Sequence, residues 1–134
     1  MEKKLPLALI LCFLIFSVKA QDISGAWNIK SGEEGQSFTI NLTHVSKNHY
    51  KGVHCALQFG TSKKDCQNKP DNYTISLVRT NENFYEGNIK SAVTNAKAGF
   101  KLQYVPLDNS LVFKLTTIPM GEFYIPKKAL MTRR

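Results

Sequence analysis

The chain has 134 residues, with 18 lysines and arginines against ten acidic residues and a formal net charge of +8. This length is enough for one domain with its own hydrophobic core. The lysines are scattered and form no continuous basic run. The composition therefore argues against a nucleic-acid partner, and the positive charge favours solubility and anionic surfaces or acidic partners.

The first 20 residues have the layout of a cleaved secretory signal. Two lysines precede an apolar run of 14 residues over 5–18, and Val18-Lys19-Ala20 places small residues before Gln21. The alternative is a retained membrane anchor, but this run is short against the roughly 20 residues that a spanning helix needs. We predict cleavage before Gln21 and a secreted or periplasmic protein without a membrane span.

Cleavage would leave 114 residues, 21–134, as one predicted domain. Three of the 18 basic residues and one of the ten acidic residues would be lost, which lowers the formal charge to +6. Cys12 would be lost with the signal, and Leu11 before it argues against a lipid anchor, which needs a small residue there. We expect a monomer without a cofactor that retains two cysteines, Cys55 and Cys66.

Alternating apolar and polar residues predict about eight antiparallel strands after residue 20. Phe38, Ile40 and Leu42, for example, alternate with threonine and asparagine, and turn-forming sequences such as "NKPDN" (68–72) separate the runs. No segment there carries a helical stripe of three turns. The predicted strands cover 24–30, 36–45, 50–58, 63–66 or 73–80, 84–92, 96–105, 110–117 and 123–132.

Short sequential connections between these strands predict an all-β, antiparallel up-and-down meander. Such a meander can curl into a small barrel, since closure removes the exposed sheet edges. A β-sandwich is the alternative. Over 50–58, the apolar residues Val53, Cys55 and Leu57 are expected to face inward with Phe59, which leaves His54 on the surface.

Six aromatic residues fall on predicted inward faces. They could line a ligand cavity or fill the interior, because an eight-stranded barrel allows either. We favour a filled core, since 114 residues offer little apolar material to spare. The six residues are Trp27, Phe38, Phe59, Phe100, Tyr104 and Phe113.

The sequence "ISGAW" (23–27) resembles the Gly-x-Trp opening of calycin-type barrels such as lipocalins and avidins. The resemblance implies a calycin-like barrel in which Trp27 closes one end. Most of the mature chain also resembles small uncharacterised secreted β-barrel proteins of bacteria, through the Gly52–Cys66 hairpin and "GEFYIPKKALMT" (121–132). That second resemblance implies fold and export but no activity.

The segment "HYKGVHCALQFGTSKKDCQN" (49–68) holds two histidines and two cysteines. His54 and Cys55 are adjacent and point to opposite faces of a strand, so they do not share a metal ion. Ten residues separate the cysteines, which does not match a redox pair. Both cysteines lie symmetrically about Gly60-Thr61, so a hairpin would place them opposite each other within disulfide reach. We predict a Cys55–Cys66 disulfide and no metal site.

Catalytic arrangements are weak in this sequence. Glu33-Glu34 and the pair Glu82 and Glu86 could act as acid and base, but their turn and strand-edge setting favours solvated surface. The triplets beginning at Asn41 and Asn72 fit the glycosylation sequon, which matters only in a eukaryotic host. We predict no enzymatic activity, and a hydrolase with a surface carboxylate pair is the least favoured alternative.

The sequence therefore favours a small exported binding protein of the cell envelope or extracellular space. A protein partner is preferred, as for an inhibitor or immunity protein, and a carrier of a small apolar ligand or a purely structural envelope component are the alternatives. The candidate contact residues lie at the tip of the stapled hairpin, where lysines would steer anionic partners. They are Phe59, Lys63 and Lys64.

Overall fold

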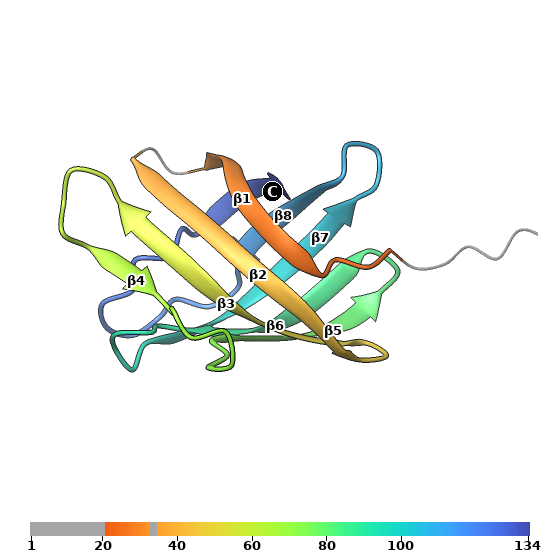
Figure 1. Ribbon diagram of the computed structural model, residues 1–134, viewed down its shortest axis with the longest axis horizontal. Coiled ribbons are helices and arrows are strands. Elements are labelled where there is room, and N and C mark those ends of the chain that lie inside the picture. The colour runs from red at the N-terminus through yellow and green to blue at the C-terminus, as the bar shows by residue number, and fades with distance from the viewer. Residues whose placement is uncertain (1–20, 33–34) are drawn as a thin grey trace, which may run out of the picture.

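The computed structural model describes residues 21–32 and 35–134, and within those ranges it contains nine β-strands and no helix (Figure 1). The predicted signal segment and the carboxylate pair Glu33-Glu34 lie outside the described residues. The strands are β1 (Gly25–Gly32), β2 (Gln36–Ser46), β3 (His49–Gln58), β4 (Lys64–Cys66), β5 (Ile75–Asn81), β6 (Phe84–Lys90), β7 (Lys97–Val105), β8 (Ser110–Leu115) and β9 (Lys128–Arg133).

The sheet closes into an antiparallel up-and-down barrel of eight strands. Neighbours in the sequence are neighbours in the sheet from β5 to β9, β9 pairs with β1, and β1 pairs with β2. The additional pairing of β2 with β3 completes the ring. The predicted barrel is confirmed, since two separate sheets of a sandwich would not form this closed ring.

The ninth strand, β4, is not one of the eight strands of the ring and pairs only with β3. The first four residues of β3 pair with β5, and Cys55 to Leu57 pair with β4 instead. The sequence left 63–66 and 73–80 as alternatives, and both segments contain a strand. The short strand β4 therefore covers the part of the β3 edge that β5 does not reach.

Side chains from all parts of the ring fill the barrel interior. Phe113 packs edge-on against Phe38, with ring centroids 5.0 Å apart, and stacks on Phe100 at 5.2 Å. Five of the six aromatic residues predicted to face inward are at most 5% exposed, namely Trp27, Phe38, Phe100, Tyr104 and Phe113. The sixth prediction was wrong, because Phe59 lies beyond the end of β3 and is 64% exposed.

The inward face of β3 is the reverse of the predicted one. Tyr50, Gly52, His54 and Ala56 are buried, whereas Val53, Cys55 and Leu57 are only half-buried on the outer face. A side chain at Gly52 would meet the Asn41 carbonyl oxygen, so the inner face has no room for larger residues there. Of the four inner residues of β3, only Tyr50 is a large apolar side chain, and Gly52 and Ala56 are small.

The last predicted strand, 123–132, begins only at Lys128. Pro126 has no backbone N–H to give to a ladder, which disfavours regular pairing before that point. Phe123 and Ile125 instead pack against the core. This segment therefore crosses the end of the barrel before it enters β9.

Trp27 lies near the start of β1, at the end of the barrel where this strand pairs with the last residues of β9. It is fully buried, and its indole N–H donates to the carbonyl oxygen of Ile23 over 2.9 Å. The guanidinium carbon of Arg133 lies 4.3 Å from its ring centroid, and the edge of Tyr104 packs against it. These contacts fit the predicted role of Trp27 in closing this end.

Candidate functional site

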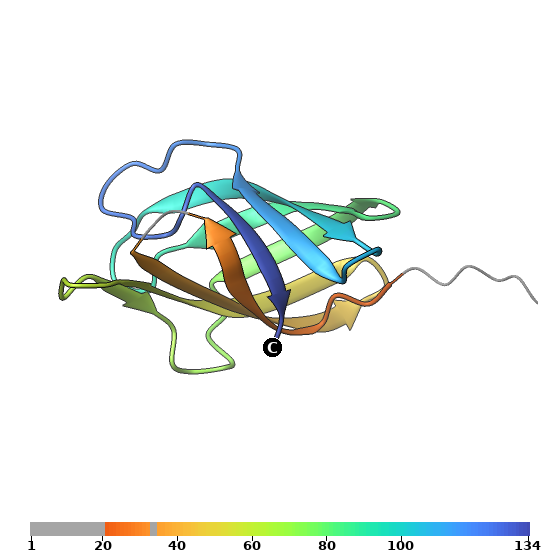
Figure 2. The ribbon, with the colours of Figure 1, turned by 90° about the horizontal axis from the view of Figure 1, so that it is seen from above.

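The opposite end of the barrel carries three long connections, which we call the loop end. They are the β3–β4 turn (59–63), the β6–β7 connection (91–96) and the β8–β9 connection (116–127), and Figures 1 and 2 show them on the side away from the start of the described chain. The hydroxyl of Thr94 donates to the carbonyl oxygen of Glu122 over 2.9 Å, which joins the second connection to the third.

The β3–β4 hairpin is stapled as predicted. Cys55 pairs directly with Cys66 in the β3–β4 register, and a disulfide joins them with the Cα atoms 3.9 Å apart. The bridge lies on the outer face of the barrel. The position symmetry that predicted it depends on the turn and not on which face points inward, so the prediction held although the face was reversed.

The three predicted contact residues differ in their surroundings. Phe59 and Lys64 are exposed at the hairpin, and Phe59 is held there by its backbone N–H, which donates to the Gly35 carbonyl oxygen over 2.7 Å. The Lys63 ammonium lies 5.5 Å from the ring centroid of Tyr124, in the β8–β9 connection. Lys63 therefore helps to join the hairpin to a second loop, and Lys64 points to no such partner in the described residues.

Three further apolar side chains are exposed at the loop end. Val93 is 60% exposed, Ile118 is 93% exposed and Met120 is 90% exposed. With Phe59 they make four large apolar residues on three connections of one barrel end, and we call these four the apolar tips. These three residues were not predicted, although "TTIPMG" (116–121) places apolar residues in a Pro- and Gly-containing loop that cannot alternate as a strand does.

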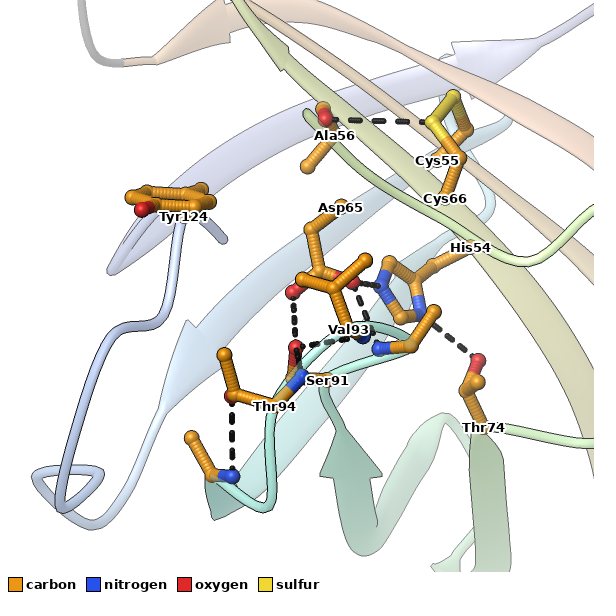
Figure 3. Close-up of polar contacts among 12 residues, drawn as sticks. His54, Cys55, Ala56, Asp65, Cys66, Thr74, Ser91, Val93, Thr94 and Tyr124 are labelled. Carbon is orange, nitrogen blue, oxygen red and sulfur yellow. Dashed lines mark hydrogen bonds and ion pairs between the residues drawn. A yellow bond between two sulfur atoms is a disulfide. The ribbon is translucent and has the colours of Figure 1, made fainter. Parts of the chain in front are cut away.

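A different group of residues, all polar and buried, lies just beneath the loop end (Figure 3). Asp65, on β4, accepts hydrogen bonds from three directions. His54 Nε2 is 2.8 Å from Oδ1, the backbone N–H of Ala92 donates to Oδ1 over 2.8 Å, and the Ser91 hydroxyl donates to Oδ2 over 2.6 Å. One carboxylate therefore joins β3, β4 and the β6–β7 connection.

The network extends to β5 through the other ring nitrogen of His54. Its Nδ1 lies 2.6 Å from the hydroxyl oxygen of Thr74, just before β5. Four of the five buried polar residues in the described ranges belong to this network, and only Ser110 lies elsewhere. We call His54, Asp65, Thr74 and Ser91 the buried network.

Hydrogen bonding keeps Asp65 ionised inside the protein. Burial raises the pKa of this carboxyl, but the hydrogen bonds from His54, Ser91 and Ala92 outweigh burial and hold the pKa below its usual value of 3.8. A buried carboxylate with three donors is stabilised only while those donors stay in place. The buried network therefore fixes the hairpin and the β6–β7 connection relative to each other.

Thr74, His54 and Asp65 form a hydroxyl–imidazole–carboxylate series of the kind that activates nucleophiles in hydrolases. Here the side chains of His54 and Asp65 are 0% exposed and Thr74 is 4% exposed. Thr74 is nearly fully buried, and its hydroxyl oxygen lies 2.6 Å from His54 Nδ1 within the buried network. We interpret the series as structural.

The other predicted polar groups stay apart from this network. Glu86 forms an exposed ion pair with Lys101 over 3.3 Å, and Glu82 lies in the turn before β6. His49 bonds to Ser76 at the surface, and the prediction that His54 lies on the surface was wrong. In residues 21–32 and 35–134 there is no group of three or more His, Cys, Asp or Glu side chains placed to hold a metal ion.

Comparison with known proteins gives no relative for this chain: no family model, no curated protein sequence and no solved structure matches it. The part of the chain that the structure describes has no helix of a length and apolar character that would cross a membrane.

Proposed function

We propose that this chain is a small exported binding protein without enzymatic activity, and that its partner is another protein that docks on the loop end. The proposal includes secretion after cleavage before Gln21 and a calycin-like relationship of the barrel. The closed ring of eight antiparallel strands and the buried Trp27 under Arg133 are consistent with that relationship. A disulfide is also compatible with an exported protein.

The apolar tips are the observation that carries this proposal. Single exposed apolar residues are ordinary on protein surfaces, but several on neighbouring loops of one end are typical of interaction sites. Phe59, Ile118 and Met120 are each more than 60% exposed. Aromatic and methionine side chains are enriched at protein interfaces, where they insert into pockets of the partner.

Rigidity and charge at the loop end support the same reading. The disulfide and the buried network hold the hairpin in place, which lowers the ordering cost of presenting Phe59 to a partner. Lys63 and Lys64 place positive charge beside it. We therefore expect a partner with an apolar pocket and an acidic rim.

The packing of the interior favours a protein partner over an internal apolar ligand. Inward-facing side chains from the strands of the ring form one buried cluster, and Phe123 and Ile125 pack against it from the β8–β9 connection. An apolar ligand inside the barrel would have to displace these contacts. The exposed apolar surface lies outside, on the tips.

The experiment compares variants of the full-length protein, made in its own host with a C-terminal tag and recovered under native conditions. Phe59→Ser with Met120→Ser removes two of the apolar tips. Leu107→Ser is the matched control, because Leu107 is 97% exposed in the turn at the opposite end of the barrel. Quantitative mass spectrometry of the recovered material measures each co-purifying polypeptide.

We expect one polypeptide to co-purify in near-equal amount with the unchanged protein and with Leu107→Ser, and to fall about tenfold or more with the double variant. Equal recovery from the double variant and the control would exclude the loop end as the site. Recovery of a small apolar molecule in place of a polypeptide would contradict a protein partner.

A further inference from the structure

A polar groove lies beside the buried network and not at the apolar tips. It has a volume of about 680 Å³ and runs between the segment before β5 and the β6–β7 connection. A neighbouring hollow of about 310 Å³ shares four of its lining residues, Tyr73, Thr74, Lys90 and Lys97. The two hollows form one polar groove, and none of the apolar tips lines it.

The buried network holds both walls of this groove. Thr74, in one wall, bonds through its hydroxyl to His54, and Ser91 and Ala92, in the other, donate to Asp65. The backbone N–H of Lys90 also donates to the Thr74 carbonyl oxygen over 2.9 Å. A groove with fixed walls binds a ligand without a large ordering cost.

Three lysines gather along the groove, and they are not neutralised. Lys90 and Lys97 are direct cross-strand partners of β6 and β7, and Lys51 lines the smaller hollow. Like charges directly opposite each other on neighbouring strands are destabilising. Among residues 21–32 and 35–134, no carboxylate lies within 4.0 Å of any of the three ammonium groups, although Asp71 also lines the groove. A bound anion would offset this repulsion.

Tyr73 lies where the two hollows meet and is half-buried. The Lys51 ammonium is 5.7 Å from the centroid of its ring. Of the eleven residues that line the larger hollow, only Tyr73 and Ala92 are apolar. An aromatic ring can pack against the C–H face of a sugar, and the amides of Asn72 and Asn95 suit sugar hydroxyls, whereas a peptide would need more apolar anchors.

We propose that this groove binds an anionic saccharide, a short sugar chain that carries carboxylate or sulfate groups. Lys90 and Lys97 contact one anionic group together, Lys51 contacts a second, and Tyr73 supports the sugar ring between them. The site is independent of protein docking at the loop end, because it uses different residues.

Calorimetric titration of the full mature protein at about 0.15 M NaCl tests this proposal, since salt at that level screens weak surface attraction. The probes are a sulfated heparin tetrasaccharide, a galacturonate tetrasaccharide, neutral cellotetraose, sodium sulfate and a tetraglutamate peptide. Lys90→Gln with Lys97→Gln removes the groove pair. The matched control is Lys101→Gln with Lys114→Gln, a second directly opposed lysine pair outside the groove with the same change in charge.

We expect at least one anionic tetrasaccharide to bind at least tenfold more tightly than cellotetraose, sulfate and tetraglutamate. The double variant Lys90→Gln with Lys97→Gln and the variant Tyr73→Ala should each weaken that binding about tenfold. The control double variant should change it less than threefold. Equal losses of affinity in the groove and control double variants would show that only net charge matters, which would overturn the proposal. Unchanged affinity in Tyr73→Ala, equal binding of tetraglutamate, or no binding of either anionic saccharide would also overturn it.

Discussion

Asp65 is a single residue on which several parts of the barrel depend. Its side chain is fully buried, and it accepts hydrogen bonds from His54, Ser91 and Ala92. Removing one member of a buried charged group leaves its partners unsatisfied, which usually costs more than the loss of a surface contact. The stability of the loop end therefore rests on this carboxylate.

Asp65→Asn should lower the free energy of unfolding by about 3 kcal/mol at pH 6. The amide that replaces the buried carboxylate cannot accept all three of its hydrogen bonds, because its NH2 group is itself a donor. Urea titrations monitored by circular dichroism measure the change. Asp71→Asn is the control, since Asp71 is exposed, and it should change stability by less than about 0.5 kcal/mol.

The stability difference between the unchanged protein and Asp65→Asn should also depend on pH. The pKa of Asp65 is lower in the folded protein than its usual 3.8, so its contribution is complete above about pH 5 and is lost as the pH falls through 4 towards the folded-state pKa. The stability difference between the unchanged protein and Asp65→Asn should narrow between pH 6 and pH 3. A constant difference over that range would mean that Asp65 is not ionised in the folded protein.

Trp27 is the residue that the Gly-x-Trp resemblance implied would close one end of the barrel. It is fully buried under Arg133 and beside Tyr104. Trp27→Ala should lower the free energy of unfolding by about 3–5 kcal/mol, as for other large buried aromatic residues. Lys114→Ala, on the outer face, should stay within about 0.5 kcal/mol. Small and equal effects of both variants in denaturant titrations would show that Trp27 does not support the barrel end.

At the scale of strands, the regular alternation of β2, β7 and β8 was enough to predict their position and their buried face. Phe38, Phe100 and Phe113 lie inside as the pattern required. For β3 the alternation predicted the wrong buried face, because the inner face carries Gly52, His54 and Ala56 and the outer face carries the disulfide. Hydrophobicity alone cannot recognise an inner face on which one position has room only for glycine and another carries a hydrogen-bonded histidine.

The candidate site could be predicted only in part for the same reason. The hairpin tip with Phe59 and the lysines was predicted from the turn, since turn chemistry is local, but Phe59 was also expected to face inward, which is wrong. The four residues of the buried network lie on four different segments of the chain. Asp65 bonds to His54 and Ser91, and His54 bonds to Thr74. The cysteine symmetry specified the register of β4 on β3, but no sequence pattern specified where β5 pairs with β3 or where the β6–β7 connection lies.

The opposed lysines of β6 and β7 allow a test of strand energetics. Lys97→Glu would turn the pairing of Lys90 with Lys97 into an opposite-charge pair. We expect this change to raise the free energy of unfolding by about 0.5 kcal/mol, because like charges in this position repel. Urea titration at low and high salt measures it. A loss of stability at low salt would show that the two ammonium groups do not face each other across the strands.

At the scale of the whole molecule, the barrel buries most of its aromatic rings in the interior and leaves the apolar tips and the groove lysines on its surface. Phe113 packs against both Phe38 and Phe100 in the interior, and Ile125 is buried near the loop end. The large exposed apolar residues of that end and the lysines of the groove are on the outside. Partners would therefore recognise loops and strand edges and would not enter the barrel.

Native mass spectrometry of the protein recovered from its own host tests this account most directly. We predict a chain that begins at Gln21, lacks two hydrogens because of the Cys55–Cys66 bridge, and is bound to a second polypeptide. Collisional activation should separate the two polypeptides and leave the mature chain without a small apolar molecule. Release of such a molecule from the barrel, with no second polypeptide in the complex, would contradict the account.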